Sequence, residues 1–148
     1  MSLVLKNLFI GNIQDAANKS FLESNRINLV INCCKEYTVD YNYLKTQNIT
    51  CVMLEYFDSL EQDLNEQGKL INVIKLIDDH LTNERGGVLV HCVAGVSRSA
   101  SVVIAYLMWK NKINFESAFR IVRQARPIVE PNSNFVNQLK SFEKLLSI

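Results

Sequence analysis

Short runs rich in Val, Ile and Leu recur along the first 90 residues, and polar residues do not alternate with the apolar ones in them. They cover residues 8–10, 29–33, 51–54 and 88–90. A strand whose successive side chains are all apolar buries both of its faces, as the strands of parallel sheets do. The pattern therefore predicts strands that are covered on both sides.

Apolar positions three or four residues apart separate and follow these runs, which is the spacing of one face of a helix. The N-terminal half alternates strand and helix, whereas the last third is helical and has Pro127 and Pro131 between its last two helices. This order is typical of an α/β protein with a mainly parallel sheet flanked by helices. The helical stripes consist of Leu70, Ile74, Ile77 and Leu81; of Phe115, Ala118, Phe119 and Val122; and of Phe135, Leu139, Phe142 and Leu146.

Length and composition indicate one globular unit. The chain has 148 residues, 48% of them hydrophobic, and no repeat or linker-like segment, so we expect residues 1–148 to form a single domain. Sixteen Lys and Arg against fifteen Asp and Glu leave a net charge of +1, which argues against nucleic acid or an anionic membrane as a partner. The longest apolar stretch, residues 102–109, is far shorter than the roughly 20 residues that cross a bilayer.

The cysteines favour a reducing compartment. They lie at positions 33, 34, 51 and 92, without the spacing of a zinc site. The N-terminus has neither the basic nor the apolar region of a secretion signal. We therefore expect a cytoplasmic protein, with the nucleus as the alternative, that acts as a monomer and uses no metal or cofactor.

The most informative segment covers residues 86–108 and reads GGVLVHCVAGVSRSASVVIAYLM. A buried strand ends at His91 and Cys92, a short loop containing Gly95 follows, and a helix begins near Ser97 or Arg98. In such a turn the backbone N–H groups point inward, and the start of the helix adds positive potential. The segment therefore predicts a cradle for a phosphate group, with Cys92 and Arg98 facing each other across the anion.

The same surroundings act on the thiol of Cys92. Inward N–H groups, a helix N-terminus and a guanidinium all stabilise a thiolate, which makes the sulfur a nucleophile at neutral pH. The thiolate can attack phosphorus while the loop and Arg98 hold the phosphate oxygens, and water can then hydrolyse the cysteinyl-phosphate. The alternative is a merely buried thiol at the end of a strand.

The stretch HCVAGVSRSAS followed by AYLM resembles the signature of the dual-specificity phosphatases in the protein tyrosine phosphatase superfamily. Residues 8–32 are similar to the opening of that fold, and RPIVEPNSNFVNQL at residues 126–139 is similar to its closing segment. The resemblance implies a three-layer α/β domain with about five strands, of the small atypical type. Classical tyrosine-specific enzymes carry an added loop that deepens the pocket, and this chain has no room for it.

The resemblance also implies roles for individual residues. Cys92 corresponds to the nucleophile, Arg98 to the phosphate clamp and Ser99 to the hydroxyl that helps the thiolate leave. His91 orders the loop through hydrogen bonds and takes no proton in the reaction. Backbone N–H groups of the loop interior bind the phosphate, and they belong to Val93, Ala94, Gly95, Val96 and Ser97.

The leaving alcohol or phenol needs a proton from a carboxylic acid on a separate loop. In the family this acid is an Asp after the strand that precedes the long helix, and Asp58 in LEYFDSLEQDL holds the matching place. The interval of 34 positions (92 minus 58) is longer than is usual in the family, and Asp63 lies five residues later. Asp58 is the predicted acid and Asp63 the alternative, while a helix-capping carboxylate is the purely structural interpretation of Asp58.

Two further residues have roles that the sequence leaves open. Cys34 ends a strand next to the one that leads to Cys92, and it resembles the resolving cysteine of some phosphoinositide phosphatases; the other interpretation is a core thiol. By strand alternation Cys33 faces the opposite side. Arg126 matches an Arg that in some family members contacts a second phosphate or an acidic flank of the substrate, and a solvated Arg at a helix end is the alternative.

The predicted function is hydrolysis of phosphotyrosine and of phosphoserine or phosphothreonine, with phosphoproteins as partners. One alternative is a weakly active pseudophosphatase that binds phosphoproteins; the joint presence of Cys92, Arg98 and Ser99 argues against it. A second is a phosphoinositide phosphatase or an RNA 5'-phosphate phosphatase of the same superfamily. Those enzymes commonly carry Lys inside the loop or Asn before the Arg, whereas the loop interior here is VAGVS.

Overall fold

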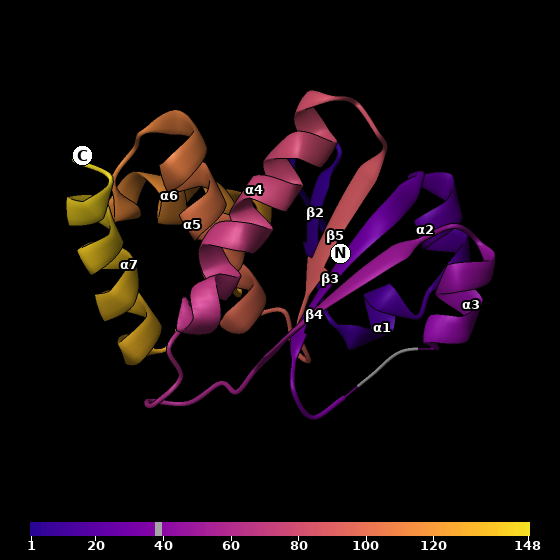
Figure 1. Cartoon of the computed structure of the whole chain (residues 1–148), viewed down its shortest axis with the longest axis horizontal. Helices are drawn as coiled ribbons and strands as arrows, with labels where there is room; N and C mark the ends of the chain where they lie inside the picture. Colours follow the sequence, from indigo (N-terminus) through magenta and orange to yellow (C-terminus); the bar gives the residue numbers. More distant parts are fainter. Residues whose placement is uncertain (38–39) are drawn as a thin grey trace.

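The computed structural model describes residues 1–37 and 40–148, and a five-stranded sheet lies at its centre between two layers of helices (Figure 1). In space the strands follow the order β1-β2-β5-β3-β4, and all neighbours are parallel except β1, which is antiparallel to β2. The predicted mainly parallel α/β sheet is confirmed. The strands are β1 (Ser2–Leu5), β2 (Leu8–Gly11), β3 (Ile27–Cys34), β4 (Thr50–Tyr56) and β5 (Gly87–His91).

The helices divide between the two faces of the sheet (Figure 1). One face carries α1 (Ile13–Ala16), α2 (Lys19–Ser24) and α3 (Tyr41–Thr46). The other carries α4 (Lys69–Thr82), α5 (Arg98–Asn111), α6 (Phe115–Ala125) and α7 (Ser133–Leu145), with a 3₁₀ turn at Glu66–Gly68 before α4. The three apolar stripes of the sequence fall on α4, α6 and α7, so those helix predictions are confirmed.

Side-chain alternation along the strands separates two apolar cores. Ile31 and Val90 belong to the larger core under α4 to α7, whereas Val30 and Leu89 belong to the smaller core under α1 to α3. Residues 98–108 of α5 are all buried, because the helix packs against the sheet and against α4, α6 and α7. This packing fixes the N-terminus of α5 at one edge of the sheet.

The strand β4 departs from the prediction of cover on both sides. It lies at the edge of the sheet with β3 as its single strand neighbour, and the Met53 side chain is 41% exposed. Leu54 and Tyr56 are buried in the larger core, so only one face is closed along the second half of the strand. No helix in residues 1–37 and 40–148 is both long and apolar enough to span a membrane.

The carboxyl ends of β2, β3, β4 and β5 lie at one edge of the sheet, because these strands are parallel. Segments that are distant in sequence therefore meet there: the residues after β3, the long connection from β4 to α4, and the turn from β5 into α5. Open parallel sheets bind their ligands at this edge.

Candidate active site

Cys92 directly follows β5, and its side chain is surrounded by polar groups although it is only 2% exposed. The backbone N–H of Gly95 donates a hydrogen bond to Sγ of Cys92 at 3.2 Å, and Oγ of Ser99 lies 3.2 Å from the same sulfur. Both groups can donate a hydrogen bond to a negatively charged sulfur.

Gly95 allows the loop between β5 and α5 to turn this tightly. Its φ is +69°, in the left-handed region that side chains disfavour. A Cβ atom at this position would lie 2.7 Å from the carbonyl oxygen of Gly11 and 2.7 Å from Nη2 of Arg126. Only glycine fits here, and its N–H thereby reaches Cys92.

No side chain of the N-cap residue caps the backbone N–H groups at the start of α5. Ser97 occupies the N-cap position, yet its side chain makes no capping hydrogen bond. Its Oγ instead accepts a hydrogen bond from the backbone N–H of Asn132 at 3.0 Å. The first N–H groups of a helix attract anions, so this end of α5 suits a phosphate group.

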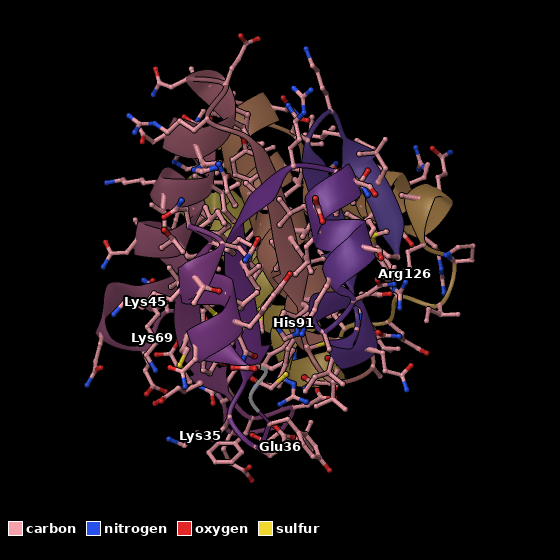
Figure 2. All side chains as sticks on the ribbon, turned by 90° about the vertical axis from the view of Figure 1, so that its right-hand side faces the viewer. Lys35, Glu36, Lys45, Lys69, His91 and Arg126 are labelled. Atoms are coloured by element: carbon pink, nitrogen blue, oxygen red, sulfur yellow. The ribbon has the colours of Figure 1, made fainter. Side chains whose placement is uncertain are left out.

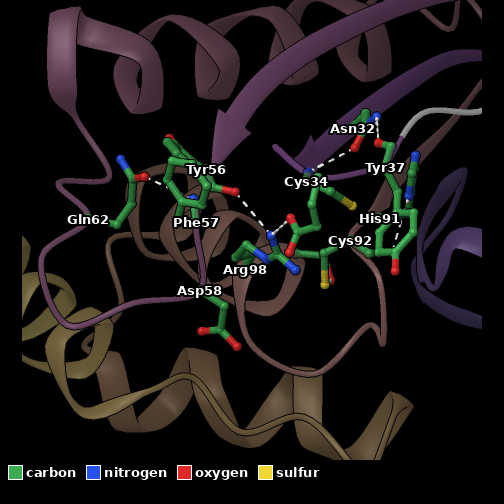
Figure 3. Close-up of polar contacts among 12 residues, drawn as sticks. Asn32, Cys34, Tyr37, Tyr56, Phe57, Asp58, Gln62, His91, Cys92 and Arg98 are labelled. Atoms are coloured by element: carbon green, nitrogen blue, oxygen red, sulfur yellow. Dashed lines mark hydrogen bonds and ion pairs between the residues drawn. The ribbon is translucent and has the colours of Figure 1, made fainter.

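Arg98 begins α5, and its side chain is held from outside the loop (Figure 3). Nη1 donates to the backbone oxygen of Tyr56 at 3.0 Å and to Oε1 of Glu36 at 2.5 Å. The hydrogen bond from Arg98 is the main cause that lowers the pKa of Glu36 below its usual value. One guanidinium nitrogen is thus fixed by protein groups, which sets the plane in which the others can meet a phosphate.

Sequence reasoning missed Glu36. The residue lies two positions after β3, and β3 is the strand beside β5. A carboxylate just beyond the end of the strand next to the phosphate loop was the available signal, but a single Glu in a connection is too common to single out.

His91 is completely buried at the end of β5. Its Nδ1 lies 3.3 Å from the backbone oxygen of Cys92, and a carbonyl only accepts, so Nδ1 carries the proton. Burial lowers the pKa of His91, which keeps the imidazole neutral at pH 7. These contacts agree with a residue that orders the loop.

The two candidate acids lie in different surroundings. Oδ1 of Asp58 accepts a hydrogen bond from Nδ2 of Asn132 at 2.8 Å, and the backbone N–H of Asn132 binds Ser97 of the phosphate loop. Asp58 is therefore linked to the loop through one residue, Asn132. Oδ1 of Asp63 accepts from the backbone N–H of Asn65 instead, which gives it the local turn role of an Asp before a helix.

Side-chain amides of α7 hold the segment that carries Asp58. Nδ2 of Asn134 donates to the backbone oxygens of Ser59 and Gln62 at 3.1 and 2.9 Å, and Nε2 of Gln138 donates to Gln62 at 2.7 Å. Oε1 of Gln138 in turn accepts from the backbone N–H of Leu64 at 2.8 Å. These hydrogen bonds fix the irregular connection from β4 to α4 at several points.

The two neighbouring cysteines of β3 do not alternate as expected. Both Cys33 and Cys34 belong to the same buried core as Cys92, so the prediction that Cys33 faces away is wrong. The register of β3 against β4 shifts between Asn32 and Cys34, and this irregularity breaks the alternation. Burial raises the pKa of Cys34 to about 12, so its thiol is protonated at neutral pH.

Arg126 lies just after α6 and is 8% exposed, so it is not a solvated residue at a helix end. Nε donates to the backbone oxygen of Gly95 at 2.9 Å, Nη2 to that of Ala94 at 3.3 Å, and Nη1 to Oγ of Ser2 at 3.3 Å. Its guanidinium thus contacts the outer side of the phosphate loop and Ser2 of β1. Figure 2 labels Arg126 together with His91, the residue that precedes this loop. This position gives no support to the predicted contact between Arg126 and a second phosphate of the substrate.

A cysteine at a strand end, inward amides, and an arginine at the start of the next helix define the class of cysteine-dependent phosphate-binding sites. Comparison with known proteins identifies the family within this class. The family "Dual specificity phosphatase, catalytic domain" matches residues 8–145. The chain therefore belongs to this family, and the resemblance drawn from its motifs is confirmed.

Two curated relatives illustrate the similarity. Dual specificity protein phosphatase 1B of Arabidopsis thaliana is 35% identical over 97% of this chain and 82% of its own length. MAP kinase phosphatase with leucine-rich repeats protein 2 of Dictyostelium discoideum is 36% identical over 96% of this chain but only 19% of its own length. The chain thus spans about a fifth of that relative, which contains much more than this domain.

Solved structures agree over nearly the whole chain. Human DUSP28 matches with a TM-score of 0.89 at 27% identity, covering 99% of this chain and 98% of that one. The human tyrosine phosphatase-like serine/threonine/tyrosine-interacting protein matches with a TM-score of 0.85 at 28% identity, covering 100% of this chain and 98% of that one. The three-layer fold of the protein tyrosine phosphatases is therefore confirmed.

Proposed function

We propose that residues 1–148 act as one catalytic domain that hydrolyses phosphotyrosine and phosphoserine or phosphothreonine in proteins through a cysteinyl-phosphate. The observation that carries the proposal is the position of Cys92 Sγ, within hydrogen-bond distance of the Gly95 N–H and the Ser99 hydroxyl at the uncapped start of α5. A thiolate there meets phosphorus with donors already arranged around the phosphate oxygens.

In the first step the Cys92 thiolate attacks phosphorus and the bond from phosphorus to the substrate oxygen breaks. The backbone N–H groups of Val93 to Ser97 and the guanidinium of Arg98 hold the three other phosphate oxygens. Asp58 gives its proton to the departing alcohol or phenol. Its hydrogen bond to Asn132, which also contacts Ser97, supports this assignment over Asp63.

In the second step water attacks the phosphorus of the cysteinyl-phosphate, and Asp58 takes a proton from that water. The sulfur leaves as a thiolate and inorganic phosphate is released. The hydroxyl of Ser99, 3.2 Å from Sγ, donates to the departing sulfur and lowers the cost of its negative charge. His91 keeps the loop in shape through its neutral ring and exchanges no proton.

Phosphoproteins are the proposed substrates, and both aryl and alkyl esters fit the proposal. The chain resembles the dual-specificity enzymes and not the classical tyrosine-specific ones, so we expect no added pocket-deepening loop. Short phosphothreonine and phosphoserine side chains then reach Cys92 as well as phosphotyrosine. The aryl ester reacts faster because a phenol is the better leaving group. Two relatives carry the name MAP kinase phosphatase, so a peptide with both phosphothreonine and phosphotyrosine belongs among the test substrates.

The test measures kcat/KM on matched peptides that carry phosphotyrosine, phosphothreonine or both, beside a phosphoinositide and an RNA 5'-triphosphate. We expect turnover of all three peptides, with phosphotyrosine fastest. Refusal of phosphothreonine would contradict dual specificity, and faster turnover of the lipid or the RNA would contradict the protein substrate class. Tight peptide binding without turnover would mean a phosphoprotein-binding module.

A further inference from the structure

We infer that Arg126 is a positioning residue for phosphate binding: it holds the carbonyl groups of Ala94 and Gly95 outward and so turns the next two N–H groups of the loop inward. The inference rests on the proposed function only in that the loop binds a phosphate. It gives Arg126 a role different from the substrate contact that its place in the motif suggests.

The carbonyl groups of the loop all point away from the phosphate site, and each meets a donor there. A peptide unit is planar and trans, so its C=O and the following N–H point in opposite directions. Holding a carbonyl outward therefore turns the next N–H inward. The donors are Nδ1 of His91 for Cys92, the N–H of Ile13 for Val93, Nη2 and Nε of Arg126 for Ala94 and Gly95, the N–H of Glu130 for Val96, and the N–H of Ser101 for Ser97.

Arg126 donates hydrogen bonds to the two carbonyl groups at the tip of this loop. The carbonyl of Ala94 precedes the N–H of Gly95, which is the group that donates to Cys92 Sγ at 3.2 Å. The carbonyl of Gly95 precedes the N–H of Val96, the next donor of the cradle. Since Nε and one Nη are fixed in one plane, a single guanidinium can bind both carbonyls at once.

The guanidinium also brings a charge to the outer side of the loop. Among the ion pairs of residues 1–37 and 40–148, none involves Arg126. Its neighbours are carbonyl and hydroxyl oxygens, which do not cancel the positive charge. A cation in this buried position adds to the attraction that the amides exert on an anion.

The test compares Arg126→Met and Arg126→Lys with the control Arg120→Met, which removes an exposed Arg from α6, the helix that precedes Arg126. Tungstate serves as the probe, and its dissociation constant is measured by calorimetry without turnover. Thermal unfolding establishes that each variant is folded. kcat and KM for an aryl phosphate and for singly and doubly phosphorylated peptides complete the comparison.

We expect Arg126→Met to weaken tungstate binding by roughly tenfold or more and to raise KM for every substrate, because hydrogen bonds from a charged donor are lost. Arg126→Lys, which keeps the charge but not the planar fork, falls between wild type and Arg126→Met. The Arg120→Met control keeps wild-type values. The preference between doubly and singly phosphorylated peptides stays unchanged in all variants.

Two results would overturn the inference. If Arg126→Met binds tungstate within twofold of wild type and loses only the preference for doubly phosphorylated peptides, Arg126 contacts the substrate. If Arg126→Met does not fold, Arg126→Lys decides, and wild-type tungstate affinity in that variant contradicts the role of the fork. If the wild-type protein binds tungstate but hydrolyses no aryl phosphate, the proposed function is wrong. The tungstate affinities of the variants still test the role of Arg126.

Discussion

Oε1 of Glu36 and Nη1 of Arg98 lie 2.5 Å apart, although 62 positions separate the two residues in the chain. The Arg98 side chain is 6% exposed, whereas that of Glu36 is 44% exposed. A carboxylate at the mouth of the site acts on a bound phosphate in two opposing ways. It repels the phosphate dianion, and it orients the guanidinium that binds this dianion.

We expect the orienting effect to dominate, because Arg98 stands between the two anions and offers each a different nitrogen. Glu36→Gln should lower kcat/KM for an aryl phosphate by roughly three- to tenfold, a modest effect because solvent screens the half-exposed Glu36 carboxylate. Glu23→Gln, on the exposed side of α2, is the matched control. An increase in kcat/KM for Glu36→Gln would show that repulsion outweighs orientation.

The second prediction separates the candidate acids. Asp58→Asn should lower kcat by about 10²- to 10⁴-fold for an alkyl phosphate and much less for an activated aryl phosphate, whose leaving group needs no proton. It should also remove the high-pH limb of the rate profile. Asp63→Asn should change neither property. The reverse outcome would assign the general acid to Asp63. If Asp58→Asn and Asp63→Asn each slow both kinds of substrate equally, neither residue acts as the general acid.

The sequence predicted most of the machinery because one continuous segment contains it. Cys92, Ser99 and the loop amides lie within a strand, turn and helix whose geometry follows from local rules. Glu36 and Asn132 come from the ends of β3 and the start of α7, and only the tertiary fold brings them to the site. Residues whose role depends on a distant segment carry no local signal, which is why both were missed.

Arg126 and Cys33 show a second limit. The motif placed Arg126 near the loop, but the direction of a long side chain depends on which acceptors are buried around it, and these are the carbonyls of Ala94 and Gly95. Strand alternation placed Cys33 opposite Cys34, and one register shift removed the distinction. Sequence patterns predict the course of the backbone better than they predict the direction and contacts of a side chain.

The third prediction concerns pH. Burial lowers the pKa of His91 below 6.5, so the unfolded chain takes up a proton before the folded one does as the pH falls. Well above pH 6.5 both states are neutral at this residue and it contributes no pH dependence. As the pH falls through 6.5, the unfolded chain binds the proton first and the free energy of unfolding decreases. The only other histidine, His80, also has a lowered pKa, and burial is its main cause.

Urea unfolding at pH 7.5 and 5.5 should therefore give lower stability at the acid value, and His80→Gln should retain part of that loss. NMR titration of the His91 ring checks the cause directly. A midpoint at or above pH 6.5 would contradict the lowered pKa and with it the neutral, loop-ordering imidazole.

The fourth prediction is reversible inactivation by peroxide with a disulfide between Cys34 and Cys92. A sulfenic acid on Cys92 condenses with a nearby thiol and releases water, and both β3 cysteines share its core. The raised pKa of Cys34, about 12, leaves little thiolate and makes this condensation slow. Peptide mapping after mild oxidation should find the pair from Cys34 to Cys92 in wild type and in Cys33→Ser.

In Cys34→Ser the same treatment should cause loss of activity that dithiothreitol does not restore. Full recovery of Cys34→Ser, or no linked peptide in wild type, would make Cys34 a core thiol. A linked pair that contains Cys33 would transfer the role to its neighbour.

The central claim is that Cys92 becomes phosphorylated during turnover. Acid quenching of a reaction with ³²P-labelled phosphotyrosine peptide, followed by peptide mapping, tests it in wild type, Cys92→Ser and Ser99→Ala. We expect label on Cys92 in wild type, more label in Ser99→Ala because the sulfur leaves more slowly, and neither label nor turnover in Cys92→Ser, all unaffected by EDTA. Label on another residue, turnover within tenfold of wild type in Cys92→Ser, or loss of activity in EDTA would contradict the account.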